Sequence, residues 1–220
     1  MDNSEVLDLM DNSLSCQNLA PFAKKTYAAT GALVEGVPLI CGGYASGYSD
    51  ECYQITKSMT SLVTNMKSKR YGAASVVLDN NQLWVMGGGD GSNILKSTEY
   101  IQIDAGSTSG PDLPLAVEGH AIVAWTSSSF MLIGGNDGDK SYLAKTFHYH
   151  VEKPDEWIPG PELKQARYWH AAGLGMDRAT NDPYIAVTGG VYKYGTVGWN
   201  LDSVELLYEG ETEWQAGKHQ

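Results

Sequence analysis

Short apolar runs that end in paired glycines recur along the chain. The runs read VPLIC, LWVM, FMLI and YIAVT, and they lead into Gly42-Gly43, Gly87-Gly88, Gly134-Gly135 and Gly189-Gly190. Runs of four or five apolar residues without polar alternation predict strands that are buried on both faces. The regular recurrence of this pattern predicts a repeat protein with one such strand in each unit.

Further segments of strand type flank each apolar run. The upstream segments are rich in small residues and read TYAATGALV, RYGAASVVL, EGHAIVAWT and RYWHAAGLG. The downstream segments alternate in polarity and read DECYQIT, STEYIQI, KTFHYHV and DSVELLY, and a fourth piece follows as EWIPGPEL or EWQAG. Four short strands in each repeat of roughly 45–50 residues, without helical periodicity, indicate the blade of a β-propeller. We therefore predict an all-β propeller of antiparallel, four-stranded blades.

The repeats divide the chain into four blades of one propeller domain, preceded by part of another blade. We expect blades over residues 25–69, 70–116, 117–166 and 167–217. In the segment 1–24, NSEVLDLM aligns with DSVELLYE of the last repeat, which predicts the outer half of a preceding blade. Four blades and a half leave strand edges and apolar faces uncovered, which natural proteins avoid. We therefore expect an incomplete ring, a fragment of a longer propeller.

The charge of the chain excludes two classes of partner. The net charge is −11, and acidic residues outnumber basic ones over each of the stretches 1–69, 70–116, 117–166 and 167–220. A surface that follows nucleic-acid phosphates needs clustered lysine and arginine. No apolar run approaches the ~20 residues of a membrane span. We therefore expect neither nucleic acid nor membrane as a partner.

The repeat resembles that of the kelch-repeat propellers. In that family an arginine opens the small-residue strand, a histidine follows three positions later, and a tyrosine and a tryptophan lie beyond the Gly-Gly pair. The matches are Arg70 and Arg167, His120 and His170, and the aromatic pairs Tyr149–Trp157 and Tyr208–Trp214. The first repeat departs from this pattern by opening with Lys25 and the third by opening with Val117, and the first two lack the tryptophan.

The resemblance implies a non-enzymatic protein-interaction module that presents one propeller face to a protein or peptide, as substrate receptors of ubiquitin ligases do. In kelch propellers that bind peptides, the loops after Gly-Gly and the starts of the inner strands build that face. By position, the candidates here are Tyr44, Asp90, Asn136, Tyr192, Arg70, Tyr71, Arg167 and Tyr168. The two arginines would clamp an extended acidic or polar peptide, unless each forms an ion pair within its own blade.

Two other functions stay open. Some kelch-type propellers are oxidases with copper held by tyrosine and histidine, but here each such residue already has a place in the repeat. His120 and His170 lack the third ligand that a metal site needs, and the loops 87–92 and 134–141 have turn chemistry rather than a phosphate or calcium motif. We therefore expect no catalytic residue, no metal and no cofactor. The other alternative is a secreted or surface recognition domain.

Two cysteines bear on that alternative. Cys41 and Cys52 lie at equal distances from the centre of GGYASGYSDE, so a symmetric hairpin would place them opposite each other. Either a disulfide or two reduced core thiols fits this position, and a disulfide would favour the secreted alternative. The N-terminus MDNSEVLDLM has no basic leader with an apolar stretch. No signal peptide is therefore predicted, and a cytoplasmic location is favoured over a secreted one.

Overall fold

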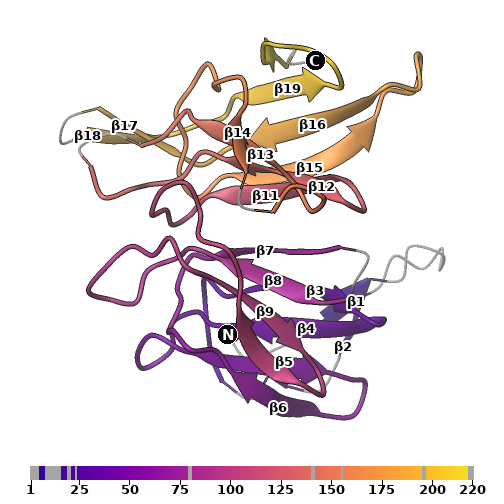
Figure 1. Ribbon diagram of the computed structural model, residues 1–220, viewed down its shortest axis with the longest axis vertical. Coiled ribbons are helices and arrows are strands. Elements are labelled where there is room, and N and C mark those ends of the chain that lie inside the picture. The colour runs from indigo at the N-terminus through magenta and orange to yellow at the C-terminus, as the bar shows by residue number, and fades with distance from the viewer. Residues whose placement is uncertain are drawn as a thin grey trace.

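The computed structural model describes residues 5–7, 16–18, 21–22, 24–78, 81–139, 142–154, 156–194 and 197–217, and these residues contain strands and no helix. Four antiparallel, four-stranded sheets are arranged as the blades of a propeller (Figure 1). This arrangement confirms the predicted fold class. Within the described ranges no segment is a helix that could span a membrane.

The strands follow one another through the four blades in chain order. The first blade holds β3 (Thr30–Val34), β4 (Val37–Cys41), β5 (Glu51–Ile55) and β6 (Thr60–Asn65). The second holds β7 (Ala74–Val77), β8 (Leu83–Met86), β9 (Thr98–Gln102) and β10 (Gly106–Ser109). The third holds β11 (Ala121–Thr126), β12 (Ser129–Ile133), β13 (Thr146–His150) and β14 (Trp157–Pro159). The fourth holds β15 (Ala171–Met176), β16 (Pro183–Thr188), β19 (Val204–Tyr208) and β20 (Gln215–Ala216).

Two small sheets stand beside the blades. β1 (Glu5–Leu7) pairs with β2 (Cys16–Asn18) within the segment expected to be a half-blade. In the fourth blade, β17 (Val191–Tyr194) and β18 (Val197–Asn200) form a hairpin between β16 and β19. A loop was expected after Gly189-Gly190, but residues 191–194 form β17 instead. The extra hairpin projects to the left in Figure 1.

The core consists of three apolar layers between neighbouring blades. In β8, Leu83 and Val85 pack with residues of the first blade, whereas Trp84 and Met86 pack with residues of the third. A third layer joins β12 to β16 through side chains such as Met131 and Ile185. Because successive side chains of a strand point to opposite faces, a strand between two blades must be apolar at every position. This explains why the runs before Gly-Gly show no polar alternation.

Backbone hydrogen bonds join the starts of the inner strands from blade to blade. The Gly72 N–H donates to the Ala28 carbonyl, the Gly119 N–H to Gly72, and the Trp169 N–H to Gly119, at 2.7–3.0 Å. These four residues are equivalent in the repeat, and all adopt a positive φ between 54° and 63°. In this alignment Thr26, rather than the predicted Lys25, stands where Arg70 stands in the second blade.

Candidate functional site

Seven aromatic side chains form a continuous cluster where the Gly-Gly loops meet the starts of the inner strands. This aromatic cluster consists of Tyr27, Tyr44, Tyr48, Tyr71, Tyr142, Tyr168 and Trp169, with neighbouring ring centroids 4.7–6.5 Å apart. Several members are open to solvent, with Tyr27 59% and Trp169 38% exposed. Contiguous exposed aromatic surface is typical of a binding site, because it buries much apolar area while keeping a polar edge.

Each blade contributes one equivalent residue to this region through an isolated bridge to the loop after Gly-Gly. The bridges pair Tyr27 with Tyr44, Tyr71 with Gly89, Glu118 with Asn136, and Tyr168 with Val191. Three of the four inner residues are therefore tyrosines, and the third blade replaces the tyrosine with Glu118. Of these four equivalent positions, only that of the third blade therefore carries a carboxylate.

Glu118 is held by one of its two carboxylate oxygens. Its Oε1 accepts hydrogen bonds from the Tyr168 hydroxyl at 3.1 Å and from Asn136 Nδ2 at 3.3 Å. Burial and then the negative charge of Glu118 raise the pKa of Tyr168 far above its usual value, so this hydroxyl stays protonated and donates. Oε2 accepts no hydrogen bond from the residues that the structure describes, and it lies so close to Gly89 that a Cβ there would be 2.8 Å away.

A depression of about 270 Å³ opens beside Glu118. Its lining includes Tyr48, Tyr71, Gly89 and Asn93, together with Glu118 itself. Across the described part of the chain no lysine or arginine forms an ion pair with Glu118. The depression therefore combines aromatic walls with a carboxylate that is paired with no cation of the described residues.

Trp169 has an unusual backbone for its size. Its φ is 56°, at the position where the second and third blades have Gly72 and Gly119. A bulky residue in the left-handed region costs roughly 1–2 kcal/mol, and such strain tends to persist where function requires it. The indole lies over Gly72, where a Cβ would approach it to 2.7 Å, and its ring centroid is 5.3 Å from that of Tyr71. Trp169 therefore fills the centre of the cluster at a conformational cost.

The predicted binding residues divide into two groups. Tyr44, Tyr71 and Tyr168 belong to the aromatic cluster, and Asn136 supports Glu118. Asp90 and Tyr192 lie outside it. The Asp90 carboxylate accepts the backbone N–H groups of Ser92 and Asn93, both at 2.8 Å, and these bonds lower its pKa. The Tyr192 ring stacks on Trp199 of the adjacent strand, 6.1 Å between centroids.

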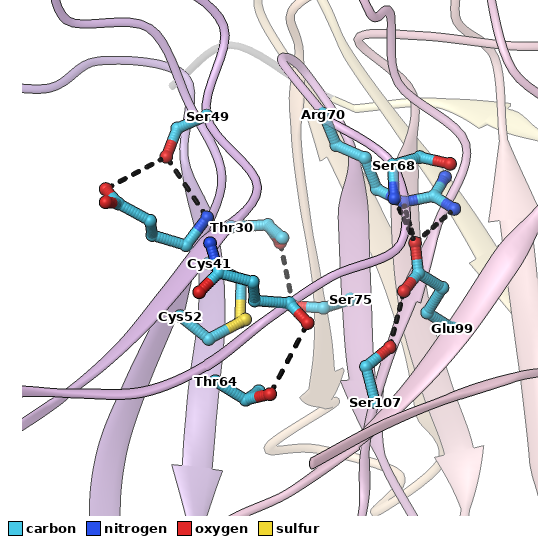
Figure 2. Close-up of a disulfide and its surroundings, with 12 residues drawn as sticks. Thr30, Cys41, Ser49, Cys52, Thr64, Ser68, Arg70, Ser75, Glu99 and Ser107 are labelled. Atoms are coloured by element: carbon cyan, nitrogen blue, oxygen red, sulfur yellow. Dashed lines mark hydrogen bonds and ion pairs between the residues drawn. A yellow bond between two sulfur atoms is a disulfide. The ribbon is translucent and has the colours of Figure 1, made fainter.

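The predicted arginine clamp is wrong. Arg70 and Arg167 are 1% and 0% exposed, so neither guanidinium can reach a partner. Each forms an ion pair inside its own blade, Arg70 with Glu99 at 3.0 Å and Arg167 with Glu205 at 2.9 Å. Figure 2 shows Arg70 directed onto Glu99, whose other contacts include Ser68 and Ser107. The alternative of an ion pair within each blade therefore holds.

The two blades without this arginine also lack the glutamate. The strand register places Tyr53 of the first blade and Phe147 of the third where Glu99 stands in the second. Thr26 and Val117 stand at the corresponding arginine positions. Because an unpaired buried charge is costly, both members of the pair are present or both are absent. This shared pattern supports a structural role for Arg70 and Arg167.

Cys41 and Cys52 are paired in the strand register and joined by a disulfide, as Figure 2 shows. Both cysteines are buried, in the layer between the first and second blades. The neighbouring residue pair, Gly42 and Glu51, is hydrogen-bonded, because the Gly42 N–H donates to the Glu51 carbonyl at 2.9 Å. The cysteines therefore occupy the closely spaced, non-hydrogen-bonded type of antiparallel pair, with Cα atoms 4.1 Å apart.

His120 and His170 face the interior. None of their four ring nitrogens has a hydrogen-bond partner in the described structure, and all four are buried. Burial lowers the pKa of His120 to about 3 and that of His170 to about 4. No three histidine, cysteine, aspartate or glutamate side chains are grouped as a metal site within the ranges described.

Sequence reasoning missed five residues of the site. These are Tyr27, Tyr48, Glu118, Tyr142 and Trp169. Two of them were visible in the repeat itself, because Glu118 replaces a tyrosine and Trp169 replaces a glycine or alanine when the four strand starts are aligned. Tyr48 and Tyr142 lie in loops that differ between the repeats, so no alignment could indicate them.

Comparisons with known proteins agree with the fold. No protein-family model matches the sequence, and the search of curated proteins found no match. Among solved structures, the chain is similar to the structure of YjhT, with a TM-score of 0.84 and 12% sequence identity. The similarity covers 97% of this chain and 77% of that one. At this identity the likeness shows a propeller fold and no more.

Proposed function

We propose that this chain is a kelch-type, non-enzymatic interaction module that binds an extended segment of a protein partner on the aromatic cluster. The observation that carries this proposal is the contiguous exposed cluster around Trp169. Tyrosine and tryptophan provide large, rigid contact areas at a small cost in side-chain entropy, and they are enriched among the residues that dominate binding energy. The cluster unites all four blades, whereas the interiors of the blades are occupied by packing and, in the second and fourth blades, by a buried ion pair.

The polar chemistry of the cluster also favours binding. General acid–base catalysis requires groups whose pKa values lie near the working pH. The burial of Tyr168 and the nearby Glu118 charge raise the pKa of this hydroxyl well above that range. The pair is therefore suited to hold a fixed hydrogen bond, which orients Glu118 toward a ligand.

Replacing Trp169 with glycine should separate binding from stability. The Trp169→Gly variant restores the residue type of the equivalent positions Gly72 and Gly119. It should lower the affinity for peptides selected from a random library on the unchanged protein by at least about tenfold, because it removes the central aromatic contact. The free energy of unfolding should stay within about 1 kcal/mol, since relief of the positive φ offsets the lost packing.

Fluorescence anisotropy with labelled peptides measures the affinity, and urea denaturation measures stability. The matched control is Met176→Ala, which truncates an exposed side chain at the opposite end of β15. Equal peptide affinities of the Trp169→Gly variant and the unchanged protein would contradict the assignment of this face.

A second candidate is a secreted or surface recognition domain, favoured by the Cys41–Cys52 disulfide. Disulfides persist in oxidising compartments and are rare in the cytosol, so this bond argues against the cytoplasmic location expected from the sequence. Alkylation of the protein in cell extracts from its native source, followed by mass spectrometry, tests this candidate. Blocked, unlabelled cysteines would support it, whereas alkylated Cys41 and Cys52 would contradict it.

A further inference from the structure

We propose that the aromatic cluster selects a cationic side chain, a lysine or arginine of the partner segment, and seats it against Glu118 in the depression lined by Tyr48 and Tyr71. This inference rests on the proposed function and names the chemistry that the partner must bring. It replaces the acidic or polar peptide expected from the sequence, because the two arginines on which that expectation depended are buried.

One carboxylate oxygen of Glu118 is an unused acceptor. Oε1 is occupied by Tyr168 and Asn136, whereas Oε2 has no donor among the described residues and lies beside Gly89, which lines the depression together with Glu118. When a partner covers a carboxylate without pairing with it, the carboxylate loses its hydration and gains no hydrogen bond or ion pair to compensate. An apolar or acidic side chain in this depression would impose that loss. An ammonium or guanidinium group would donate a hydrogen bond to Oε2 and so compensate for the lost hydration.

Glu118 differs from the two buried glutamates in its partners. Glu99 and Glu205 each have an arginine from their own blade. In the third blade the arginine position is Val117, and Glu118 comes directly after it. Among the described residues, the fold therefore supplies a cation to Glu99 and Glu205 and none to Glu118.

Aromatic rings surround the depression beside Glu118. Tyr48 and Tyr71 line the depression, with ring centroids 6.0 Å apart. Aromatic faces attract cations through their quadrupole. The cluster already contains one such contact at its edge, where Lys193 Nζ lies 5.8 Å from the centroid of Tyr142. Aromatic rings around a carboxylate are thus suited to a long cationic side chain with an apolar stem.

Four end-blocked alanine-based peptides test this inference directly. They differ only in the central residue, which is lysine, arginine, norleucine or glutamate, so norleucine keeps the lysine stem without its charge. We expect the lysine and arginine peptides to bind at least about tenfold more tightly than the norleucine peptide in an NMR titration at low salt. The glutamate peptide should bind more weakly still, because its charge is repelled by Glu118.

Two protein variants identify the group responsible. Glu118→Gln keeps an acceptor and removes the charge, and Glu118→Tyr reproduces the residue of the other three blades. Both should bring the lysine-to-norleucine ratio to within about twofold. The Glu99→Asp variant, at a carboxylate already paired with Arg70, should leave this ratio unchanged.

The outcomes distinguish the inference from the function on which it rests. Equal binding of the lysine and norleucine peptides, no binding of any of the four, or a ratio unaffected by Glu118→Gln would each overturn the cation inference. The function itself would still stand if library peptides bind the unchanged protein and lose affinity in Trp169→Gly. If the random library yields no peptide that depends on Trp169, the proposed function fails.

Discussion

Lowering the pH from 7 to 5 is expected to reduce the free energy of unfolding by about 4 kcal/mol, because His120 and His170 must remain neutral in the folded protein. Burial lowers the pKa of His120 to about 3, with a further contribution from nearby His170. Burial lowers the pKa of His170 to about 4, with a further contribution from Arg167. The unfolded chain has no such restriction, and its histidines titrate near the ordinary value of 6.5.

The direction in which stability changes with pH follows from proton uptake by the two histidines. Well above pH 6.5 both histidines are neutral in both states, so their contribution to stability is complete. Between that value and the folded pKa values, the unfolded chain binds protons that the folded protein does not bind, and stability falls as the pH falls. Each histidine contributes about 2 kcal/mol of this loss at pH 5.

Urea denaturation at the two pH values measures the effect. The control is the double variant His120→Ala/His170→Ala, which has the residue that the first two blades carry at Ala29 and Ala73. It should be less stable at pH 7 but should lose much less stability between pH 7 and 5, and the remaining loss comes from His148, whose pKa is also lowered by burial and then by His150. Glu99 does not affect this comparison. Its pKa lies below the usual 4.5, so its contribution to folding stability is lost only in more acidic solution. Equal losses in both proteins would show that other groups cause the acid sensitivity.

Removing one member of the Arg70–Glu99 pair is expected to cost about 3–5 kcal/mol, because the other charge is left buried without its partner. Arg70 Nη2 and Glu99 Oε1 are 3.0 Å apart, and both side chains are almost fully buried. Glu99 also accepts the backbone N–H groups of Lys67 and Ser68, at 2.6 and 3.1 Å. Glu99 therefore holds the segment that leads into the second blade in place. Glu205 likewise accepts the backbone N–H groups of Lys164 and Gln165, which precede the fourth blade.

A double-mutant cycle tests this expectation. The single variants are Arg70→Val and Glu99→Phe, and their combination reproduces the residues of the third blade, Val117 and Phe147. The double variant should be destabilised by less than the sum of the two single variants, because it contains no unpaired charge. Urea denaturation at pH 7 gives the three free energies. Strictly additive losses would mean that the two residues stabilise the fold independently.

The sequence by itself determined the blade architecture of this protein. Short apolar runs, paired glycines and alternating segments report local geometry, and they recur often enough to predict all four blades. The same local logic indicated that Cys41 and Cys52 lie opposite each other, because the length of a hairpin sets its register. Continuous burial of the β8 run followed from the run's composition, because a strand between two blades has no solvent face.

Only the tertiary structure decided how side chains from different blades meet. Nothing local distinguishes an arginine that faces a partner from one that turns inward, and the burial of Arg70 depends on Glu99, 29 residues further along the chain. The contact of Glu118 with Tyr168 spans 50 residues and two blades. The positive φ of Trp169 reflects the hydrogen bond from its N–H to Gly119 in the third blade. Such contacts depend on the closeness of inner strands around one centre, which no local pattern encodes.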